Sequence, residues 1–195
     1  MSELLDWLAK AYLGESQARN RYTKYAKIAQ QEGYEQIAAI FLQTADHERV
    51  HGLKYFDMFQ EVKKKLGKSL DDYALDGIAV PNVMNTTAEN LEAAIAGEHF
   101  ENSELYPMIA DVAKKEGYSV FAARIRSIAK AEEHHEARYK KLLEQVKAGT
   151  VLQKSKKVWW YCRHCGYWHY GEKPPEKCPS CDHPKSYFQV LSEEY

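Results

Sequence analysis

The chain has 195 residues, a length that suggests one large domain or a medium-sized domain with a small one attached. Hydrophobic residues make up 45% and charged residues 28%, proportions that exclude a disordered or collagen-like chain. The 27 Lys and Arg residues nearly balance the 28 Asp and Glu residues, so no excess of positive charge points to nucleic acid or an anionic membrane. No uncharged apolar stretch reaches the roughly 18 residues of a membrane span, and the N-terminus has acids where a signal peptide has bases. We therefore expect a cytoplasmic protein with neither a membrane nor a nucleic-acid partner.

Up to about residue 147, apolar residues recur at intervals of three and four, the period of an amphipathic helix. Gly33 and Gly117 each stand in the tripeptide Glu-Gly-Tyr, and a glycine just past a helix end is the usual left-handed cap. Thr86 and Glu89 match a capping box at the start of another helix. The expected helices span residues 3–31, 34–65, 87–116 and 119–147.

A long connection, residues 66–86, separates the first two expected helices from the last two. It contains Gly67, Gly77, Pro81 and several Asp, and it is too long for a tight turn. It fits the single long crossover of a ferritin-like four-helix bundle.

The two helix pairs repeat each other along the chain. Gly14-Glu15 in the first pair corresponds to Gly97-Glu98 in the second. In the same way, Glu48 and His51 correspond to Glu132 and His135, but the separation of these positions is longer by one residue. An insertion or deletion of a single residue reconciles the two separations. We therefore expect a pseudo-two-fold bundle in which equivalent residues face each other.

Ionisable residues interrupt the apolar stripe of every expected helix near its middle. Burying unpaired carboxylates costs many kcal/mol, so cations must accompany them. A Glu-x-x-His pair on each of two helices, with one Glu from each of the others, is the ligand set of di-iron and di-manganese carboxylate bundles. Oxygen donors with two imidazoles suit iron or manganese better than zinc or calcium. The candidate ligands are Glu15, Glu48, His51, Glu98, Glu132 and His135.

Glu101 breaks the symmetry of the repeat, because it lies three residues after Glu98 where the first repeat has Ala18. We interpret it as an extra ligand to one metal ion; the alternative is a solvated helix charge. Tyr22 and Tyr106 could present hydroxyls to the carboxylates, although core packing is the slightly better explanation of Tyr106. Three further histidines point off the stripe and are expected at the surface or behind the ligands: His47, His99 and His134.

After residue 147 the composition changes. Residues 148–157 are polar and rich in Lys, a linker that nothing in its composition would hold to the bundle. Residues 158–195 are rich in aromatics, Gly and Pro with short strand-like pieces, and so short a segment needs a metal to fold. Two Cys-x-x-Cys pairs form a strong metal-site pattern, although their spacing fits zinc as well as iron. Disulfides, the alternative, are disfavoured in the cytosol. The four cysteines are Cys162, Cys165, Cys178 and Cys181.

The whole chain resembles a rubrerythrin. The resemblance rests on the stretches GESQARNRY, EGYEQIAAIF, HERVH, GEHFENSELYP, AEEHHEARY and CRHCGYWHYGEKPPEKCPSC. It implies a mainly α protein with a ferritin-like di-iron bundle over residues 1–147, and a rubredoxin-like domain with short β-strands over residues 158–195. Asp182 stands where rubredoxins typically have Gly. The implied ligands are Glu15, Glu48, His51, Glu98, Glu101, Glu132 and His135 for two non-haem irons, and Cys162, Cys165, Cys178 and Cys181 for a mononuclear iron.

The resemblance also implies a function. It suggests a peroxidase that reduces hydrogen peroxide to water in defence against oxidative stress, as a head-to-tail homodimer. Electrons would return through the thiolate-bound iron from a rubredoxin or an NAD(P)H-dependent reductase. The alternatives are a ferroxidase or iron-handling protein of ferritin type and a non-catalytic electron carrier. The fused one-electron centre favours the peroxidase, because a ferroxidase needs no port for a reductant.

Overall fold

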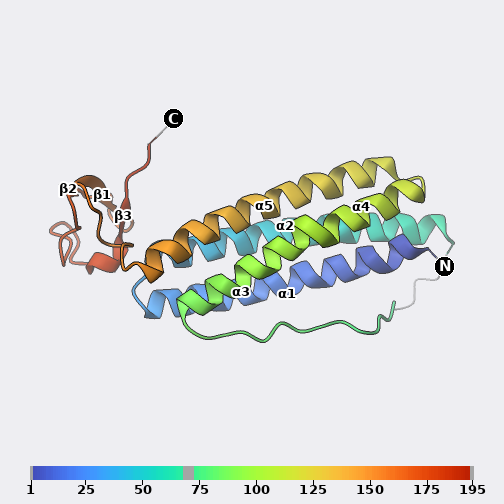
Figure 1. The fold of residues 1–195 in the computed structure, drawn as a ribbon, viewed down its shortest axis with the longest axis horizontal. Coiled ribbons are helices and arrows are strands. Elements are labelled where there is room, and N and C mark those ends of the chain that lie inside the picture. Colours follow the sequence, from blue (N-terminus) through green and yellow to red (C-terminus); the bar gives the residue numbers. More distant parts are fainter. Residues whose placement is uncertain (1, 68–72, 194–195) are drawn as a thin grey trace.

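Long helices lie side by side in an elongated bundle, and the C-terminal residues form a small unit at one end of it (Figure 1). The helices are α1 (Glu3–Gln31), α2 (Glu35–Lys65), α3 (Thr87–Phe100), α4 (Tyr106–Lys115) and α5 (Ser119–Lys147). The computed structural model describes residues 2–67 and 73–193. α1 packs along α2, while α5 packs along both α3 and α4, so the predicted mainly α, four-helix architecture is confirmed. No helix in the described part of the chain is long and apolar enough to cross a membrane.

The two Glu-Gly-Tyr turns tie the halves of the bundle together. Gly33 and Gly117 adopt φ values of 82° and 88°, the left-handed conformation expected of a glycine cap. The glutamate of each turn then caps the first helix of the other repeat. The Oε1 of Glu32 accepts the backbone N–H of Thr87 at 3.2 Å, and the Oε1 of Glu116 accepts that of Leu4 at 3.0 Å. Both carboxylates sit at the positive end of a helix dipole, which favours them electrostatically.

The long crossover is confirmed where the structure describes it. Residues 73–86 contain neither helix nor strand and run along the length of the bundle (Figure 1); residues 68–72 of the predicted connection lie outside the described residues. Tyr25 fastens the crossover to α1, because its hydroxyl donates to the Val83 carbonyl at 2.8 Å. The predicted capping box starts α3, with the Thr86 N–H donating to Glu89 and the Glu89 N–H to the Thr86 hydroxyl.

A π-helix, η1 (Glu101–Leu105), interrupts the third long helix, so the expected single helix over residues 87–116 is wrong at this point. At the end of η1 the N–H of Tyr106 donates to the carbonyl of Glu101, five residues earlier. Pro107 follows directly and has no N–H, so the ladder of helical hydrogen bonds is interrupted at this point.

The π-turn also explains why the repeat separation changes along the chain. Glu98 lies before η1, and its separation from Glu15 is the shorter of the two. Glu116 lies after η1, and its separation from Glu32 is longer by one residue. A π-turn accommodates one extra residue within a helix. The turn at η1 is therefore the single inserted residue.

The apolar core of the bundle is split in two. One buried cluster includes Leu8, Tyr55 and Ile125, and the other includes Ala29, Phe41 and Leu142. The polar residues predicted as ligands lie between these clusters, at mid-height of the bundle. Apolar packing above and below thus fixes the positions of the four backbones that carry those residues.

The C-terminal unit is built on a three-stranded antiparallel sheet of order β2-β1-β3. Its buried core contains Trp160, Phe188 and two of the cysteines. A short 3-10 helix, η2 (Lys185–Tyr187), leads into the last strand. The strands are β1 (Val158–Cys162), β2 (Trp168–Gly171) and β3 (Phe188–Val190).

The segment between α5 and β1 is held on both sides, so the expectation of a linker unattached to the bundle is wrong. Val151 is buried in the second bundle cluster, and Leu152 packs against both that cluster and the core of the C-terminal unit. Lys154 donates through its Nζ to the side chain of Gln145 at 2.7 Å and through its backbone N–H to the Glu172 carbonyl at 2.8 Å. Two apolar residues within a polar stretch are enough to anchor it.

Candidate metal centres

Six of the seven predicted bundle ligands meet in one buried place. They form two groups of four, in each of which one ligand atom from every residue lies within 4.8 Å of the others. Glu48 and Glu132 belong to both groups, which is the arrangement expected of two metal ions bridged by shared carboxylates. The first group is Glu15, Glu48, His51 and Glu132, and the second is Glu48, Glu98, Glu132 and His135.

Both imidazoles turn the same ring nitrogen toward the carboxylates. The Nδ1 of His51 lies 2.8 Å from Glu132 Oε1 and 3.0 Å from Glu48 Oε2. The Nδ1 of His135 lies 2.8 Å from Glu132 Oε2 and 3.3 Å from Glu48 Oε1. Glu98 Oε2 completes the second group at 3.4 Å from the same nitrogen. Each Glu-x-x-His pair thus directs an oxygen and a nitrogen into a common space.

Several buried ligand atoms of the cluster make no properly directed hydrogen bond, although other ligands lie close to them. Such orphaned atoms are costly in a protein interior, and a cation is the group that satisfies carboxylate oxygens and an imidazole nitrogen together. Four buried carboxylates also repel one another unless positive charge is present. The residues therefore fit a pair of metal ions. The unpartnered atoms are Glu15 Oε2, Glu48 Oε1, Glu98 Oε2, both carboxylate oxygens of Glu132, and His135 Nδ1.

Two tyrosines orient the outer carboxylates by a crossed pair of hydrogen bonds. Tyr22 on α1 donates to Glu98 Oε1 at 2.6 Å, and Tyr106 on α4 donates to Glu15 Oε1 at 2.6 Å. The two tyrosines are equivalent in the repeat at the longer separation, and each bonds the glutamate of the other repeat. The hydroxyl of Tyr106 therefore does more than pack in the core. A ligand held in this way keeps its orientation.

His47 lies behind a ligand, one of the two positions expected for it, although the sequence pattern did not reveal which ligand it contacts. Its Nδ1 lies 3.0 Å from the Nε2 of His135, and the two rings stack at a centroid distance of 5.2 Å. This contact holds the ring of His135 on the side away from the cluster, while the Nδ1 of His135 faces the carboxylates. His47 comes directly before Glu48 and off the apolar stripe, which is why its spacing did not mark it. His134 is exposed, and His99 is paired with Glu136 at 3.2 Å.

Glu101 lies beside the two groups without belonging to either. It is half-buried at the start of η1. Burial and the charges of Glu98 and Glu132 raise its pKa well above the ordinary value, whereas the cation of Arg21 acts in the opposite direction. Glu101 is therefore close enough to the cluster for the charges of the ligands to act on it.

Without metal ions, protons take the place of the missing positive charge. Burial and the charges of Glu132 and Glu48 raise the pKa of Glu15 well above its ordinary value, and burial raises that of Glu98 to about 7. Burial alone would lower the pKa of His51, but its close contacts with Glu132 and Glu48 outweigh this and raise the pKa to about 9. Burial also acts to lower the pKa of His135, but Glu132, Glu48 and Glu98 outweigh it and raise the pKa to about 12. Metal binding must displace these protons.

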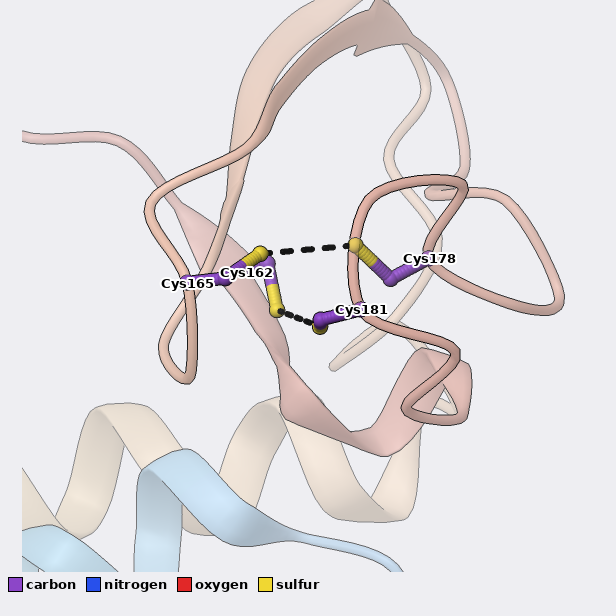
Figure 2. A group of neighbouring side chains, drawn as sticks. All are labelled: Cys162, Cys165, Cys178 and Cys181. Atoms are coloured by element: carbon purple, nitrogen blue, oxygen red, sulfur yellow. Dashed lines mark hydrogen bonds between the residues drawn. The ribbon is translucent and has the colours of Figure 1, made fainter.

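The four cysteines converge in the C-terminal unit (Figure 2). The Sγ atoms of Cys162 and Cys181 are 3.7 Å apart, and those of Cys165 and Cys178 are 3.6 Å apart. A tetrahedral metal with metal–sulfur bonds of about 2.3 Å requires sulfur atoms about 3.8 Å from one another. All four are free thiols, at distances far too long for disulfides of roughly 2.05 Å.

The two Cys-x-x-Cys turns have the same backbone geometry, including the unusual one. The N–H of Gly166 donates to the Cys162 carbonyl at 2.8 Å, and the N–H of Asp182 donates to the Cys178 carbonyl at 3.0 Å. Gly166 has a φ of 78° and Asp182 a φ of 62°. Aspartate is one of the few residues other than glycine that adopts this conformation. The departure at Asp182 thus preserves the turn, and an ion pair with Lys177 at 2.8 Å supports it.

Comparison with known families agrees with this geometry. The family model described as "Rubrerythrin" matches residues 6–143, and "Rubrerythrin, rubredoxin-like domain" matches residues 160–189. The chain belongs to the rubrerythrin family. Two non-haem irons in the bundle and one thiolate-bound iron in the rubredoxin-like domain, as predicted from the sequence, are the cofactors of this family.

Relatives and solved structures extend over nearly the whole chain. A putative rubrerythrin of Methanocaldococcus jannaschii is 57% identical over all of this chain and 96% of its own length. The rubrerythrin of Nitratidesulfovibrio vulgaris is 42% identical over 93% of this chain and 90% of its own. The all-ferrous structure of nigerythrin, 30% identical, superposes with a TM-score of 0.64 over 98% of this chain and 88% of that one. A bacterioferritin of Desulfovibrio desulfuricans, at 21% identity and a TM-score of 0.59, shares the fold over 75% of this chain and 81% of that one.

The proton balance of the cluster predicts how stability depends on pH in the metal-free protein. The pKa of Glu98 (about 7, ordinary value 4.5) and that of His51 (about 9, ordinary value 6.5) are both raised in the folded state. Between about pH 5 and pH 9 these two groups therefore bind more protons in the folded chain than in the unfolded chain, and their contribution to the free energy of unfolding falls as pH rises. The lowered pKa values of His47 and His134 oppose this only near and below their ordinary value of 6.5. Thermal denaturation of metal-free protein should show a Tm that decreases across this window. Metal-loaded protein should lack the decrease, because the ions replace the protons.

The control for this prediction is Glu98→Gln, which keeps the shape of the side chain and removes one titrating group. Its metal-free form should lose less stability between pH 5 and pH 7 than the parent. A metal-free parent whose Tm rises from pH 5 to pH 9 would contradict the assignment of protons to the cluster.

Proposed function

We propose that this protein is a non-haem di-iron peroxidase that reduces hydrogen peroxide to water, with electrons delivered through its four-cysteine iron. The proposal rests on one observation: a single chain joins a buried two-ion carboxylate cluster with orphaned ligand atoms to a four-thiolate centre. The family supports an iron-dependent oxidoreductase. We place the protein in the cytoplasm, where four thiols this close together stay reduced.

When bound, the iron pair supplies the two electrons needed to cleave the O–O bond of peroxide, which with two protons gives two molecules of water. The chain contributes the environment. Glu15, Glu48, Glu98, Glu132, His51 and His135 are the proposed ligands, together with Glu101. The hydrogen bonds from Tyr22 and Tyr106 hold the outer carboxylates in place. The apolar clusters on either side exclude water and strengthen every electrostatic contact within the site.

A ferritin-type ferroxidase is the second candidate, because the bundle shares its fold with a bacterioferritin. The thiolate centre favours the peroxidase, since oxidation of iron by dioxygen does not need a second centre that delivers electrons. We expect about three iron atoms per chain, and NADH-dependent consumption of peroxide when a rubredoxin and its reductase are supplied. Cys178→Ser combined with Cys181→Ser should lose one iron and the NADH-linked turnover but keep the bundle irons. Steady accumulation of iron without peroxide turnover would favour the ferroxidase.

Glu101 and His51 are proposed to alternate as a ligand of one ion. An anionic oxygen suits the ion at higher charge, and a neutral imidazole suits it at lower charge. His51 belongs to the first group, and the charge of Glu101 acts on Glu15 of the same group, which supports this pairing.

Glu101→Ala should therefore slow peroxide turnover while leaving fold and iron content intact, because it removes a half-buried charge. Steady-state kinetics, iron content and thermal denaturation would measure this. Glu104→Ala is the matched control, since Glu104 is an exposed glutamate in the same π-helix. Equal turnover in the Glu101→Ala and Glu104→Ala variants would remove Glu101 from the mechanism.

Electrons are proposed to pass between subunits of a head-to-tail homodimer. From His135 to the end of α5 at Lys147, the helix rises by about 18 Å. The C-terminal unit, which contains the four cysteines, lies beyond that end of the bundle (Figure 1), and the anchored segment around Val151 keeps it there. Electron tunnelling falls steeply with distance, so transfer within one chain is disfavoured. Antiparallel association would bring one chain's thiolate iron to the other chain's cluster.

A heterodimer tests transfer between subunits. One chain carries Cys178→Ser and Cys181→Ser, and the other carries Glu48→Ala and Glu132→Ala. Each parent homodimer should be inactive, whereas the isolated heterodimer should regain NADH-linked turnover because it keeps one competent pair of centres. A heterodimer as inactive as its parents, with its remaining metals bound, would show that transfer runs within one chain.

A further inference from the structure

The two halves of the bundle differ at one position beside the carboxylate cluster. At the repeat separation that relates Glu48 to Glu132, Gly52 on α2 corresponds to Glu136 on α5. The carboxylate of Glu136 is buried and links α5 to the third long helix, because Asn102 Nδ2 donates to it at 2.7 Å and His99 Nδ1 lies 3.2 Å away. Gly52 has no side chain with which to close the equivalent groove between α1 and α2.

That groove contains a cavity of about 140 Å³. Glu48, which is 2% exposed, is the member of the carboxylate cluster in its lining. A β-carbon at position 52 would lie 3.2 Å from Glu15 Cβ and 3.8 Å from the ring of Tyr12, so a larger residue there would crowd the helices and the cavity wall. The lining also includes Arg19, Arg49 and Leu53.

Other cavities are larger but end elsewhere. One of about 420 Å³ lies between α1 and the crossover beside Arg21, and one of about 440 Å³ lies at the junction with the C-terminal unit beside Gly33. Neither is lined by a residue of the carboxylate cluster. The small cavity between α1 and α2 is thus the one of these three that reaches the cluster.

The size and charge of this cavity limit what can pass. A water molecule takes up roughly 30 Å³ in the liquid, so the cavity holds a few waters or one small peroxide. Arg19 is exposed at the rim and forms no ion pair among the described residues, and Arg49 has a long one, 3.8 Å, with Asp46. Two cations at the mouth oppose the entry of ferrous ions but leave a neutral or anionic oxidant unhindered.

We propose that the cavity between α1 and α2 is the port through which small oxidants of the hydrogen peroxide class reach the metal cluster, and that Gly52 and Leu53 set its size limit. The proposal deepens the proposed peroxidase function and rests on it for the identity of the oxidant. Bulky organic hydroperoxides are excluded by the small volume of the cavity. The pseudo-equivalent groove is closed by Glu136, so access is one-sided.

Sodium azide, a small anion that binds ferric iron, tests the port without turnover. Its association with oxidised, iron-loaded protein is followed by stopped-flow absorption. Leu53→Trp places a large side chain at the mouth, on a position that is 49% exposed and so tolerant of bulk. Association should slow by roughly tenfold, equivalent to about 1.4 kcal/mol of added barrier. Leu42→Trp is the matched control, because Leu42 lies on the same helix, is 43% exposed and is outside the cavity.

A second variant, Gly52→Ala, narrows the port from inside and should also slow azide association. Wild-type protein should in addition turn over hydrogen peroxide much faster than cumene hydroperoxide. If Leu53→Trp and Gly52→Ala both bind azide at the rate of the parent and of Leu42→Trp, the proposal that oxidants enter through this cavity is wrong. Slowed azide association without any peroxide turnover would keep the port and reject the peroxidase, so the two failures are distinguishable.

Discussion

The buried negative charge at mid-height of the bundle is the constraint on which the rest of the structure depends. Glu15, Glu48, Glu98 and Glu132 are almost completely buried, and they occupy the interval between two apolar clusters. No hydrophobic gain there offsets their desolvation, so cations or protons must. Each half of the core supplies the packing, and ions held by the cluster would join the halves. The cluster is thus a structural as well as a chemical element of the bundle.

Much of this could be predicted from sequence because the repeat makes the signal redundant. A single buried glutamate is indistinguishable from a surface one by spacing, but Glu48-x-x-His51 and Glu132-x-x-His135 at matching repeat positions are hard to explain otherwise. The π-helix was visible only as a change of one residue in the repeat separation. Helical periodicity tolerates such an insertion over a few turns, which is why residues 87–116 were expected to form one continuous helix.

What the sequence left out depends on three-dimensional neighbours with no fixed spacing. His47 contacts His135 from a distant part of the chain, and no period along α2 marks it. Val151 and Leu152 anchor a segment whose average composition is polar. The position of the segment depends on these two side chains, whereas an average composition gives every residue of the segment the same weight. At Asp182 the sequence suggested a difference that the structure does not have. Aspartate replaces the expected glycine, but the turn is unchanged because aspartate also tolerates the left-handed conformation.

The departures from two-fold symmetry are concentrated at the cluster. Tyr22 and Tyr106 keep the symmetry, bonding equivalent carboxylates in a crossed pair. Ala18 and Glu101 break it, as do Gly52 and Glu136. A strictly symmetric bundle would hold two equal ions with equal exposure, and neither ion would be distinguished by a variable ligand or by access. In the proposals above, Glu101 would make the two ion positions unequal, and Gly52 would make the two sides unequal in access. Duplication of a helix pair explains why the two halves carry equivalent metal ligands. The few residues that differ between the halves explain how an oxidant could reach the ligands from one side only.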